Sequence, residues 1–272
     1  MGHAGTLDPL ATGVLLVCIG PACKRAQELQ DHDKEYVAGI RFGATTPSYD
    51  LEKEVDRTFP YDQVTEEAVR AVLPSFLGPQ EQVAPLFSAK SVDGVRAYEM
   101  ARKLYRNAQK GILDPDFDAA ALETLHRSRI TISELELLGF VEAFNAIEAS
   151  AETPRTNFFS PEKRSKKSCP TPDADAACTE TVISSGVSAD GQTDVKSASS
   201  RIHVADTSSL GLPEAKIRIA CSKGTYIRAF ARDLGEALGT GAHLSSLVRT
   251  KTGDFRLEDA LSLEEALALL AE

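Results

Sequence analysis

"GHAGTLDPLATG", residues 2–13, places three glycines and an Asp-Pro pair within twelve residues. Proline disfavours the α region for the residue before it, so we expect Asp8 in extended geometry on a stiff turn. The glycines are expected to allow positive φ or a close backbone approach. The apolar run VLLVCIG at 14–20 then predicts a buried strand. No Gly-Lys-Ser/Thr follows, which argues against a phosphate loop. Taken alone, the stretch also fits an ordinary turn whose carboxylate caps backbone amides.

The composition is typical of a soluble globular protein. The 272 residues are 42% hydrophobic and 26% charged, enough for one large domain or two small ones. No apolar run approaches the eighteen or so residues of a membrane helix, and no signal peptide is expected. The five cysteines form no CxxC pair, so neither a disulfide framework nor a zinc site is predicted. A reducing compartment, the cytoplasm or an organelle matrix, fits best.

The charge is distributed unevenly along the chain. The net charge of −10 argues against a nucleic-acid partner, but residues 216–256 carry eight basic and three acidic side chains. A basic stretch of this kind can bind a polyanion even in an acidic protein. The alternative interpretation is a solvated charged surface.

The predicted elements mix strands and helices without a strict βαβ rhythm, which favours an α+β domain with a mixed sheet. Residues 84–104 predict a strand, a turn and a helix from about Val95. Ser262 and Glu265 form a capping box that opens a last helix. The other predicted strands are 34–43, 127–140 and a segment around Ile217 and Ile219, and the other predicted helices are 21–33, 64–78 and one from Tyr226 to Gly239.

A low-complexity segment interrupts this pattern. Residues 160–200 contain no aromatic residue and no leucine, so they cannot bury enough apolar surface to offset the entropy of ordering. We therefore predict a first part of the domain at 1–144, a mostly disordered insertion at 145–209, and a second part of the domain at 210–272.

Two distant segments carry side chains that would complement each other. Asp8 is a stiffly held carboxylate, and Arg228 follows the sequence SKGTY at the opening of a predicted helix. An arginine facing an aspartate favours the charged form of the carboxylate, which leaves it available for attack. Tyr36 and Tyr226 offer flat faces on which a base can stack.

Four blocks of the sequence resemble the TruB family of tRNA pseudouridine synthases, and they occur in the family's order. They are GHAGTLDPLATGVLLVCIGPACK, DKEYVAGIRFG, APLFSAKSVDGVRAYEMAR and CSKGTYIRAFARDLGEALGTGAHLSSLVRTKTG. The resemblance implies the pseudouridine synthase fold, with a mixed, mostly antiparallel sheet flanked by helices around a central active-site cleft. It implies isomerisation of uridine 55 in the T loop of tRNA by a monomer, without a metal or an organic cofactor.

The resemblance also assigns roles to individual residues. Asp8 matches the catalytic aspartate, Arg228 the arginine that pairs with it, and Tyr36 the tyrosine that stacks on the target uracil. The residues matched to substrate binding are His3 against the T-loop RNA, Tyr226 beside the arginine, Leu247 in the uracil pocket, and Arg249 close by. Lys223 is not matched in this way; it is a candidate phosphate contact, with a solvated surface lysine as the alternative.

The chain departs from the family pattern at both ends. A strand and helix with a Lys-Pro-x-Gly motif are expected before residue 2, so we expect a truncated N-terminus. We also expect no C-terminal PUA domain. Two other functions remain open at this point: a non-catalytic tRNA-binding or folding factor, and a guide-RNA-dependent subunit of the dyskerin type.

Overall fold

The computed structural model describes residues 1–85, 91–92, 95–96, 127–143 and 204–271. The chain divides into two compact units, one formed by 1–148 and 203–272 and the other by 149–202. The second unit lies outside the described residues, as does the part of the predicted insertion (145–209) that runs from 145 to 203. The fold below is that of the first unit.

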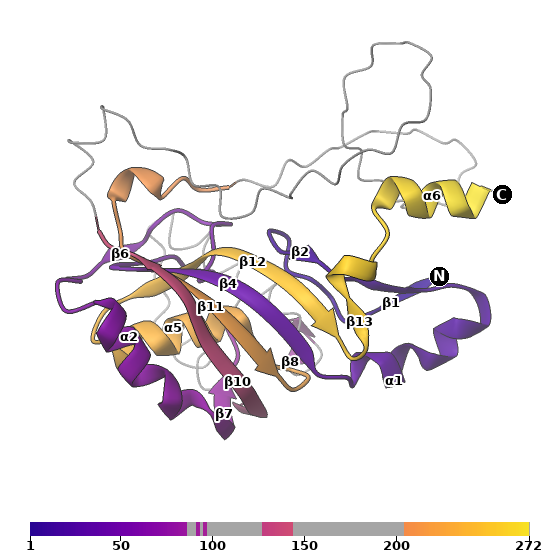
Figure 1. The fold of residues 1–272 in the computed structure, drawn as a ribbon, viewed down its shortest axis with the longest axis horizontal. Helices are drawn as coiled ribbons and strands as arrows, with labels where there is room; N and C mark the ends of the chain where they lie inside the picture. Colours follow the sequence, from indigo (N-terminus) through magenta and orange to yellow (C-terminus); the bar gives the residue numbers. More distant parts are fainter. Residues whose placement is uncertain (86–90, 93–94, 97–126, 144–203, 272) are drawn as a thin grey trace, which may run out of the picture. The chain divides into compact units, whose positions relative to one another are not determined.

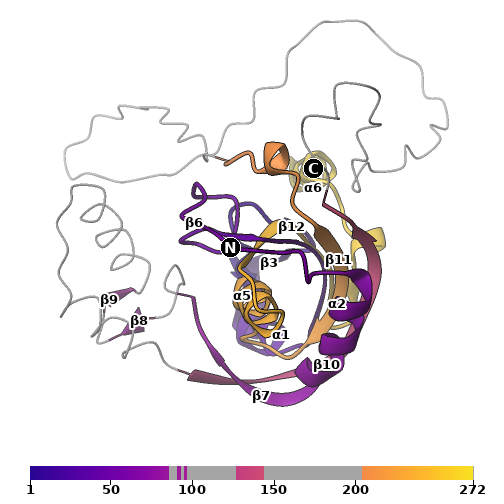
Figure 2. The same ribbon diagram turned by 90° about the vertical axis from the view of Figure 1, so that its left-hand side faces the viewer.

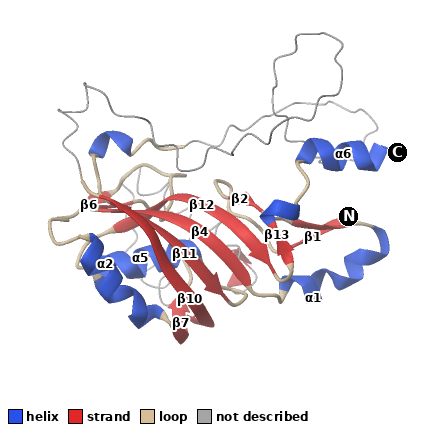
Figure 3. Ribbon diagram, viewed as in Figure 1, coloured by secondary structure: helices blue, strands red, loops and turns tan. Residues whose placement is uncertain are grey.

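A seven-stranded sheet forms the centre of this unit (Figures 1 and 3). Its order is β13-β12-β4-β11-β10-β7, every neighbouring pair is antiparallel, and β2 adds to β12 in parallel. This arrangement confirms the predicted α+β class with a mixed, mostly antiparallel sheet. The strands are β2 (Thr12–Gly13), β4 (Lys34–Phe42), β7 (Gly78–Val83), β10 (Arg127–Val141), β11 (Glu214–Cys221), β12 (Ala242–Thr252) and β13 (Phe255–Arg256).

The two inner strands follow from their side-chain patterns. The sequence of β4, KEYVAGIRF, is buried along almost its whole length, as expected for a strand covered on both faces. In β11 buried and half-buried residues alternate, which places Ile217 and Ile219 on the core face. The predicted strands 34–43 and 127–140 and the strand around these isoleucines are therefore confirmed.

The helix α5 (Ile227–Ala237) packs against this sheet, which curves around it (Figure 2). Phe230 and Leu234 are buried on its inner face, at the helical spacing that predicted them. Phe230 also meets Phe76 edge to face, with ring centroids 5.3 Å apart. The remaining helices within the described residues are η1 (Gly20–Arg25), α1 (Ala26–Gln30), α2 (Glu66–Val72), η2 (Leu73–Phe76), η3 (Ser208–Leu210), η4 (Leu257–Asp259) and α6 (Leu263–Ala271).

The last helix begins as predicted. The Ser262 amide donates to Glu265 Oε2 at 2.8 Å and the Glu265 amide donates to Ser262 Oγ at 3.2 Å, which is a complete capping box. Among the described helices, none has both the length and the apolar character needed to cross a membrane.

Three short elements differ from the prediction. The strand expected at 14–20 is only β3 (Leu16–Cys18), which pairs with β1 (Gly2–Ala4) outside the main sheet. Cys18 is buried but Val17 is 51% exposed, so the strand is only partly buried. The helix expected at 21–33 is a 3₁₀ turn followed by the five residues of α1. Val95–Arg96 is strand β9, paired with β8 (Ser91–Val92), so no helix begins at Val95; residues 97–104 lie outside the described residues. A third two-stranded pair joins β5 (Ala44–Thr45) and β6 (Arg57–Thr58).

The predicted boundary of the insertion at residue 209 is several residues too late. Ala205 and Thr207 are 2% and 3% exposed. The Ala205 amide donates to the Leu51 carbonyl at 2.8 Å, and Arg41 Nη1 donates to Thr207 Oγ1 at 2.7 Å. The polar composition around these residues did not indicate that they are ordered. Their hydrogen bonds go to distant segments, and such bonds leave no pattern in the local sequence.

Candidate active site

The loop between β1 and β2 holds Asp8 on a turn. The Ala11 amide donates to the Asp8 carbonyl at 2.9 Å, with Pro9 inside the turn. Gly5 and Gly13 have φ of +91° and +105°, as expected for glycine, whereas Gly2 has neither positive φ nor a close neighbour. A Cβ on Gly13 would clash with the backbone of β12. The loop that carries Asp8 is therefore fixed to the sheet at Gly13.

Asp8 and Arg228 form a two-pronged ion pair. Arg228 Nη2 donates to Asp8 Oδ1 at 2.7 Å, and Arg228 Nε donates to Asp8 Oδ2 at 3.0 Å. The Arg228 side chain is 6% exposed and the Asp8 side chain 32% exposed. The second residue of α5 thus fixes the orientation of the carboxylate while leaving part of it accessible.

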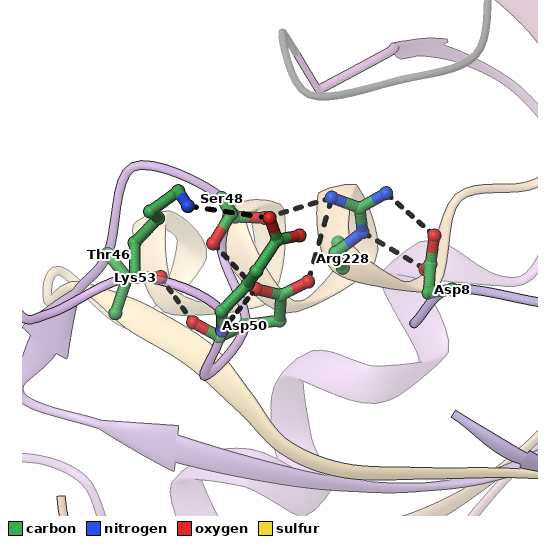
Figure 4. Close-up of polar contacts among 7 residues, drawn as sticks. Asp8, Thr46, Ser48, Asp50, Lys53 and Arg228 are labelled. Carbon is green, nitrogen blue, oxygen red and sulfur yellow. Dashed lines mark hydrogen bonds and ion pairs between the residues drawn. The ribbon is translucent and has the colours of Figure 1, made fainter. Parts of the chain in front are cut away.

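A second carboxylate lies on the other side of the same guanidinium (Figure 4). Arg228 Nη1 donates to the Ser48 carbonyl at 3.3 Å and lies 3.7 Å from Asp50 Oδ2. Asp50 Oδ1 accepts from Ser48 Oγ at 2.5 Å and from the Glu52 amide at 2.9 Å. Burial raises the pKa of Asp50, and the Ser48 hydroxyl and Arg228 oppose that shift. The turn after β5 therefore presents a buried, hydrogen-bonded carboxylate to Arg228.

A cleft of about 740 Å³ brings together most of the residues that the sequence singled out. Its lining includes seven of them: Asp8, Tyr36, Lys223, Tyr226, Arg228, Leu247 and Arg249. The eighth, His3, lies exposed on β1 and is not part of this lining. Segments separated by most of the chain thus meet around one cavity.

The aromatic and apolar walls come from two adjacent strands and from the start of α5. Tyr36 on β4 is opposite Arg249 on β12, and it is 9% exposed. Burial raises the pKa of Tyr36, which the nearby Arg249 opposes. Leu247 is 8% exposed on β12. The backbone of Tyr226, just before α5, is held by the Gln82 amide, which accepts from its N–H at 2.9 Å and donates to its carbonyl at 3.1 Å.

Arg249 is directed at the loop and not at open solvent. It is 1% exposed. Its Nε donates to the Val14 carbonyl at 2.7 Å, Nη2 to the Gly5 carbonyl at 3.2 Å, and Nη1 to the Thr6 carbonyl at 3.4 Å. In this structure it therefore holds the loop that carries Asp8 onto the sheet. Lys223, by contrast, is exposed and pairs with Asp31 across the cleft rim at 2.9 Å.

Two residues of the site were not identified from the sequence. Asp50 lies in TTPSYDLEKEVD, which has the composition of an ordinary polar loop. Lys34 lines the cleft, is 8% exposed, and donates to the carbonyls of Gln30 and His32, each at 2.5 Å. Burial lowers the pKa of Lys34. Asp50 lies outside the four quoted blocks, and Lys34 lies within DKEYVAGIRFG but was given no role there. Only the folded arrangement shows that both side chains are buried.

The geometry suits chemistry on a flat, uncharged group. A fixed carboxylate faces a cleft whose walls include a tyrosine and a leucine, so a planar ring can lie against them beside the carboxylate. Within the part of the chain that the structure describes, no cluster of three or more His, Cys, Asp and Glu side chains is arranged to hold a metal ion.

Comparison with known proteins gives a consistent assignment. Residues 1–111 match the model of the "TruB family pseudouridylate synthase (N terminal domain)", and residues 228–272 match that of the "tRNA pseudouridylate synthase B C-terminal domain". A solved structure reported as "Crystal Structure of a Cbf5-Nop10-Gar1 Complex" aligns with 97% of this chain and 44% of its own chain, with a TM-score of 0.48 and 20% identity.

Curated bacterial proteins are more similar. The tRNA pseudouridine synthase B of Phocaeicola vulgatus is 40% identical over 264 residues, covering 97% of this chain and 76% of that protein. The protein of the same name from Bacteroides thetaiotaomicron is 41% identical with the same coverage. With similarity of this extent over nearly its whole length, the chain belongs to the TruB family of pseudouridylate synthases.

Proposed function

We propose that this protein converts uridine 55, in the T loop of tRNA, into pseudouridine, and that Asp8 starts the reaction. The observation that carries the proposal is the Asp8–Arg228 pair on the wall of the cleft. The name shared by the relatives, tRNA pseudouridine synthase B, supports tRNA as the substrate. The T-loop position rests on the motif resemblance.

The reaction exchanges one bond for another. The N1–C1′ bond of uridine breaks, the uracil turns, and C5 bonds to C1′; C5 loses a proton and N1 gains one. A carboxylate can start this by attacking C1′ or by taking a proton from the sugar. Both routes need a carboxylate in a fixed position, which the two bonds from Arg228 provide.

The walls of the cleft suit an extruded base. A uridine in a folded loop has to leave its stack before its glycosidic bond can be reached. Tyr36 supplies a ring face and Leu247 an apolar contact for the uracil. The exposed Lys223 at the rim can approach the RNA backbone, whereas Arg249 serves the substrate indirectly by holding the Asp8 loop.

The test is tritium release from tRNA transcripts labelled at C5 of uridine, without guide RNA. Wild type should release one tritium per tRNA, and a transcript with cytidine at position 55 should release none. Asp8→Asn should bind tRNA normally in a filter assay but lose on the order of 10⁴-fold in rate.

Other outcomes would point to other functions. If Asp8→Asn kept a tenth of the wild-type rate, the aspartate would not start the reaction. Binding without any release by wild type would indicate a tRNA-binding factor. Release only after addition of a guide RNA would indicate a guide-dependent enzyme.

A further inference from the structure

Tyr49 has an unusual backbone conformation. Its φ is +57°, and among the described residues it is the one non-glycine with a positive φ. The left-handed region is unfavourable for a residue with a Cβ, so the surrounding structure has to hold it there. Such strain is often found close to functional groups, and Tyr49 lies between two residues that contact Arg228, Ser48 and Asp50.

Three contacts hold Tyr49 in this conformation. Its amide donates to the Thr46 carbonyl at 3.0 Å, which closes the turn. Its carbonyl accepts from the Leu244 amide of β12 at 3.0 Å. Its ring lies 5.6 Å from the guanidinium carbon of Arg232. Arg232 is itself fixed, because it donates to Asp233 and to the Val83 carbonyl.

The strained conformation has a geometric consequence. Tyr49 lies in a turn whose two neighbouring residues both approach Arg228 Nη1. The Ser48 carbonyl accepts a hydrogen bond from Nη1, and the Asp50 carboxylate lies 3.7 Å from it (Figure 4). Arg232 follows Arg228 by four residues on α5 and therefore lies on the same side of the helix. One arginine binds the polar atoms of the turn and the other binds the tyrosine ring.

We propose that Tyr49 is a positioning residue for the Asp8–Arg228 pair. Its ring, held by Arg232, keeps the turn in the conformation that directs Ser48 and Asp50 at Arg228. The guanidinium is then fixed on one side by the turn and presented to Asp8 on the other. Tyr49 is not in the lining of the cleft and acts only through Arg228. The kinetic part of its test rests on the proposed function.

Three substitutions separate the ring from the backbone. Tyr49→Phe keeps the ring and should retain kcat within about twofold. Tyr49→Ala removes the ring but keeps the strain, so kcat should fall about 10- to 100-fold, since small misplacements near a reacting centre have effects of this size. KM for tRNA should stay within about threefold, because the cleft lining is unchanged. Tyr49→Gly should recover part of the lost kcat, because glycine adopts this φ without strain.

The order of the last two variants is the decisive result. Glycine removes more atoms than alanine, so a residue that serves only as packing would make Tyr49→Gly the worse variant. Positioning predicts the reverse. Tyr61→Ala is the matched control: Tyr61 also packs against the core, next to Gly43, and its loss should lower the melting temperature without changing kcat.

A spectroscopic readout does not depend on activity. The Nε–H resonance of Arg228, assigned by its loss in Arg228→Lys, reports the bond to Asp8 Oδ2. It should shift or broaden in Tyr49→Ala, and stay unchanged in Tyr49→Phe and Tyr61→Ala.

The outcomes are separable. An unchanged resonance in folded Tyr49→Ala would overturn the inference, as would wild-type kcat in that variant or a lower kcat in Tyr49→Gly than in Tyr49→Ala. If wild type forms no pseudouridine, the proposed function fails, and the resonance alone decides on Tyr49. If Tyr49→Ala does not fold, Tyr49→Gly carries the same resonance test against Tyr49→Phe.

Discussion

At the scale of single residues, burial distinguishes the two carboxylates that share Arg228. The Asp50 side chain is 8% exposed and bound by a hydroxyl and a backbone amide, whereas the Asp8 side chain is 32% exposed and borders the cleft. Asp50 also borders a smaller pocket, which Asp8 shares, but it is not in the lining of the large cleft. We therefore expect Asp50 to fix Arg228, and Asp8 to be the carboxylate available for chemistry at the cleft.

Asp50→Asn tests this division. Asparagine has nearly the same shape but no charge, so Arg228 loses the partner 3.7 Å from its Nη1 and can shift relative to Asp8. We expect pseudouridine formation to fall roughly 10- to 100-fold with tRNA affinity unchanged. Asp56→Asn, an exposed aspartate in the same loop that accepts from Thr45, is the control and should behave as wild type. A wild-type rate in Asp50→Asn would show that the Asp50 charge is not needed to fix the arginine.

How far the site could be predicted differs from residue to residue. Asp8 and Arg228 occur in segments rich in glycine and turn residues, and their contact is present as predicted. Asp50 and Lys34 could not be found in this way. Asp50 is buried beside Arg228, far away in the chain, and a polar loop residue looks the same in sequence whether it becomes buried or stays exposed. Lys34 begins β4, and lysine is a residue type that is usually exposed, so its sequence context gives no sign of burial.

At the scale of elements, one of the two shortest strands of the sheet has a large effect on the site. β2 has two residues, yet it joins the Asp8 loop to β12, where Gly13 is opposite Arg249 and the Val14 amide donates to the Arg249 carbonyl at 2.9 Å. The Arg249 side chain, on the same strand, adds three hydrogen bonds to this loop. Loss of this pairing would release Asp8 from its position relative to Arg228.

Gly13→Ala should break this attachment. An added Cβ would lie 2.8 Å from the Arg249 amide nitrogen and closer still to its carbonyl, and alanine disfavours φ of +105°. We expect a lower melting temperature and a rate reduced by about 100-fold or more, since the loop has to move. Gly2→Ala is the control, because nothing lies within 4 Å of a Cβ there. Wild-type melting and turnover in Gly13→Ala would contradict the attachment.

Long elements were predictable and short ones were not, for a physical reason. β4, β11 and α5 bury many side chains each, so their period is repeated enough to be recognised. β3 and β9 have three and two residues, and their pairing with β1 and β8 decides their conformation. Local sequence contains little information about such partners.

At the scale of the whole molecule, the site is made by joining the two ends of the described domain. The Arg228–Asp8 bonds span 220 positions in sequence, and the bond from Arg249 to Val14 spans 235. A site of this kind exists only when the sheet is complete. Activity and the cooperative unfolding transition should therefore disappear together on heating.

A buried hydrogen-bond network around His243 links the stability of the fold to pH. His243 on β12 is fully buried. Its Nδ1 lies 2.9 Å from the Ala44 carbonyl oxygen, and its Nε2 lies 3.4 Å from Thr207 Oγ1. Thr207 Oγ1 also accepts a hydrogen bond from Arg41. These partners fit a neutral ring that donates from Nδ1 and accepts at Nε2. Burial, assisted by Arg41, lowers the pKa of His243, with the Ala44 carbonyl and Glu214 opposing.

The direction of this shift predicts how stability changes with pH. Above the ordinary histidine pKa of about 6.5 the ring is neutral in both states, so stability is fully present. As pH falls below that value the unfolded chain binds a proton that the folded state resists, and the free energy of unfolding decreases by up to about 1.4 kcal/mol per pH unit from this residue. The loss continues until pH reaches the lowered pKa of His243 in the folded protein.

Urea unfolding at pH 7.5 and 5.5 measures this loss of stability. His243→Gln is the comparison, because glutamine can donate to the Ala44 carbonyl and accept from Thr207 but does not titrate. Wild type should lose more stability than His243→Gln between the two pH values; equal losses would show that His243 is not the group that links folding to pH.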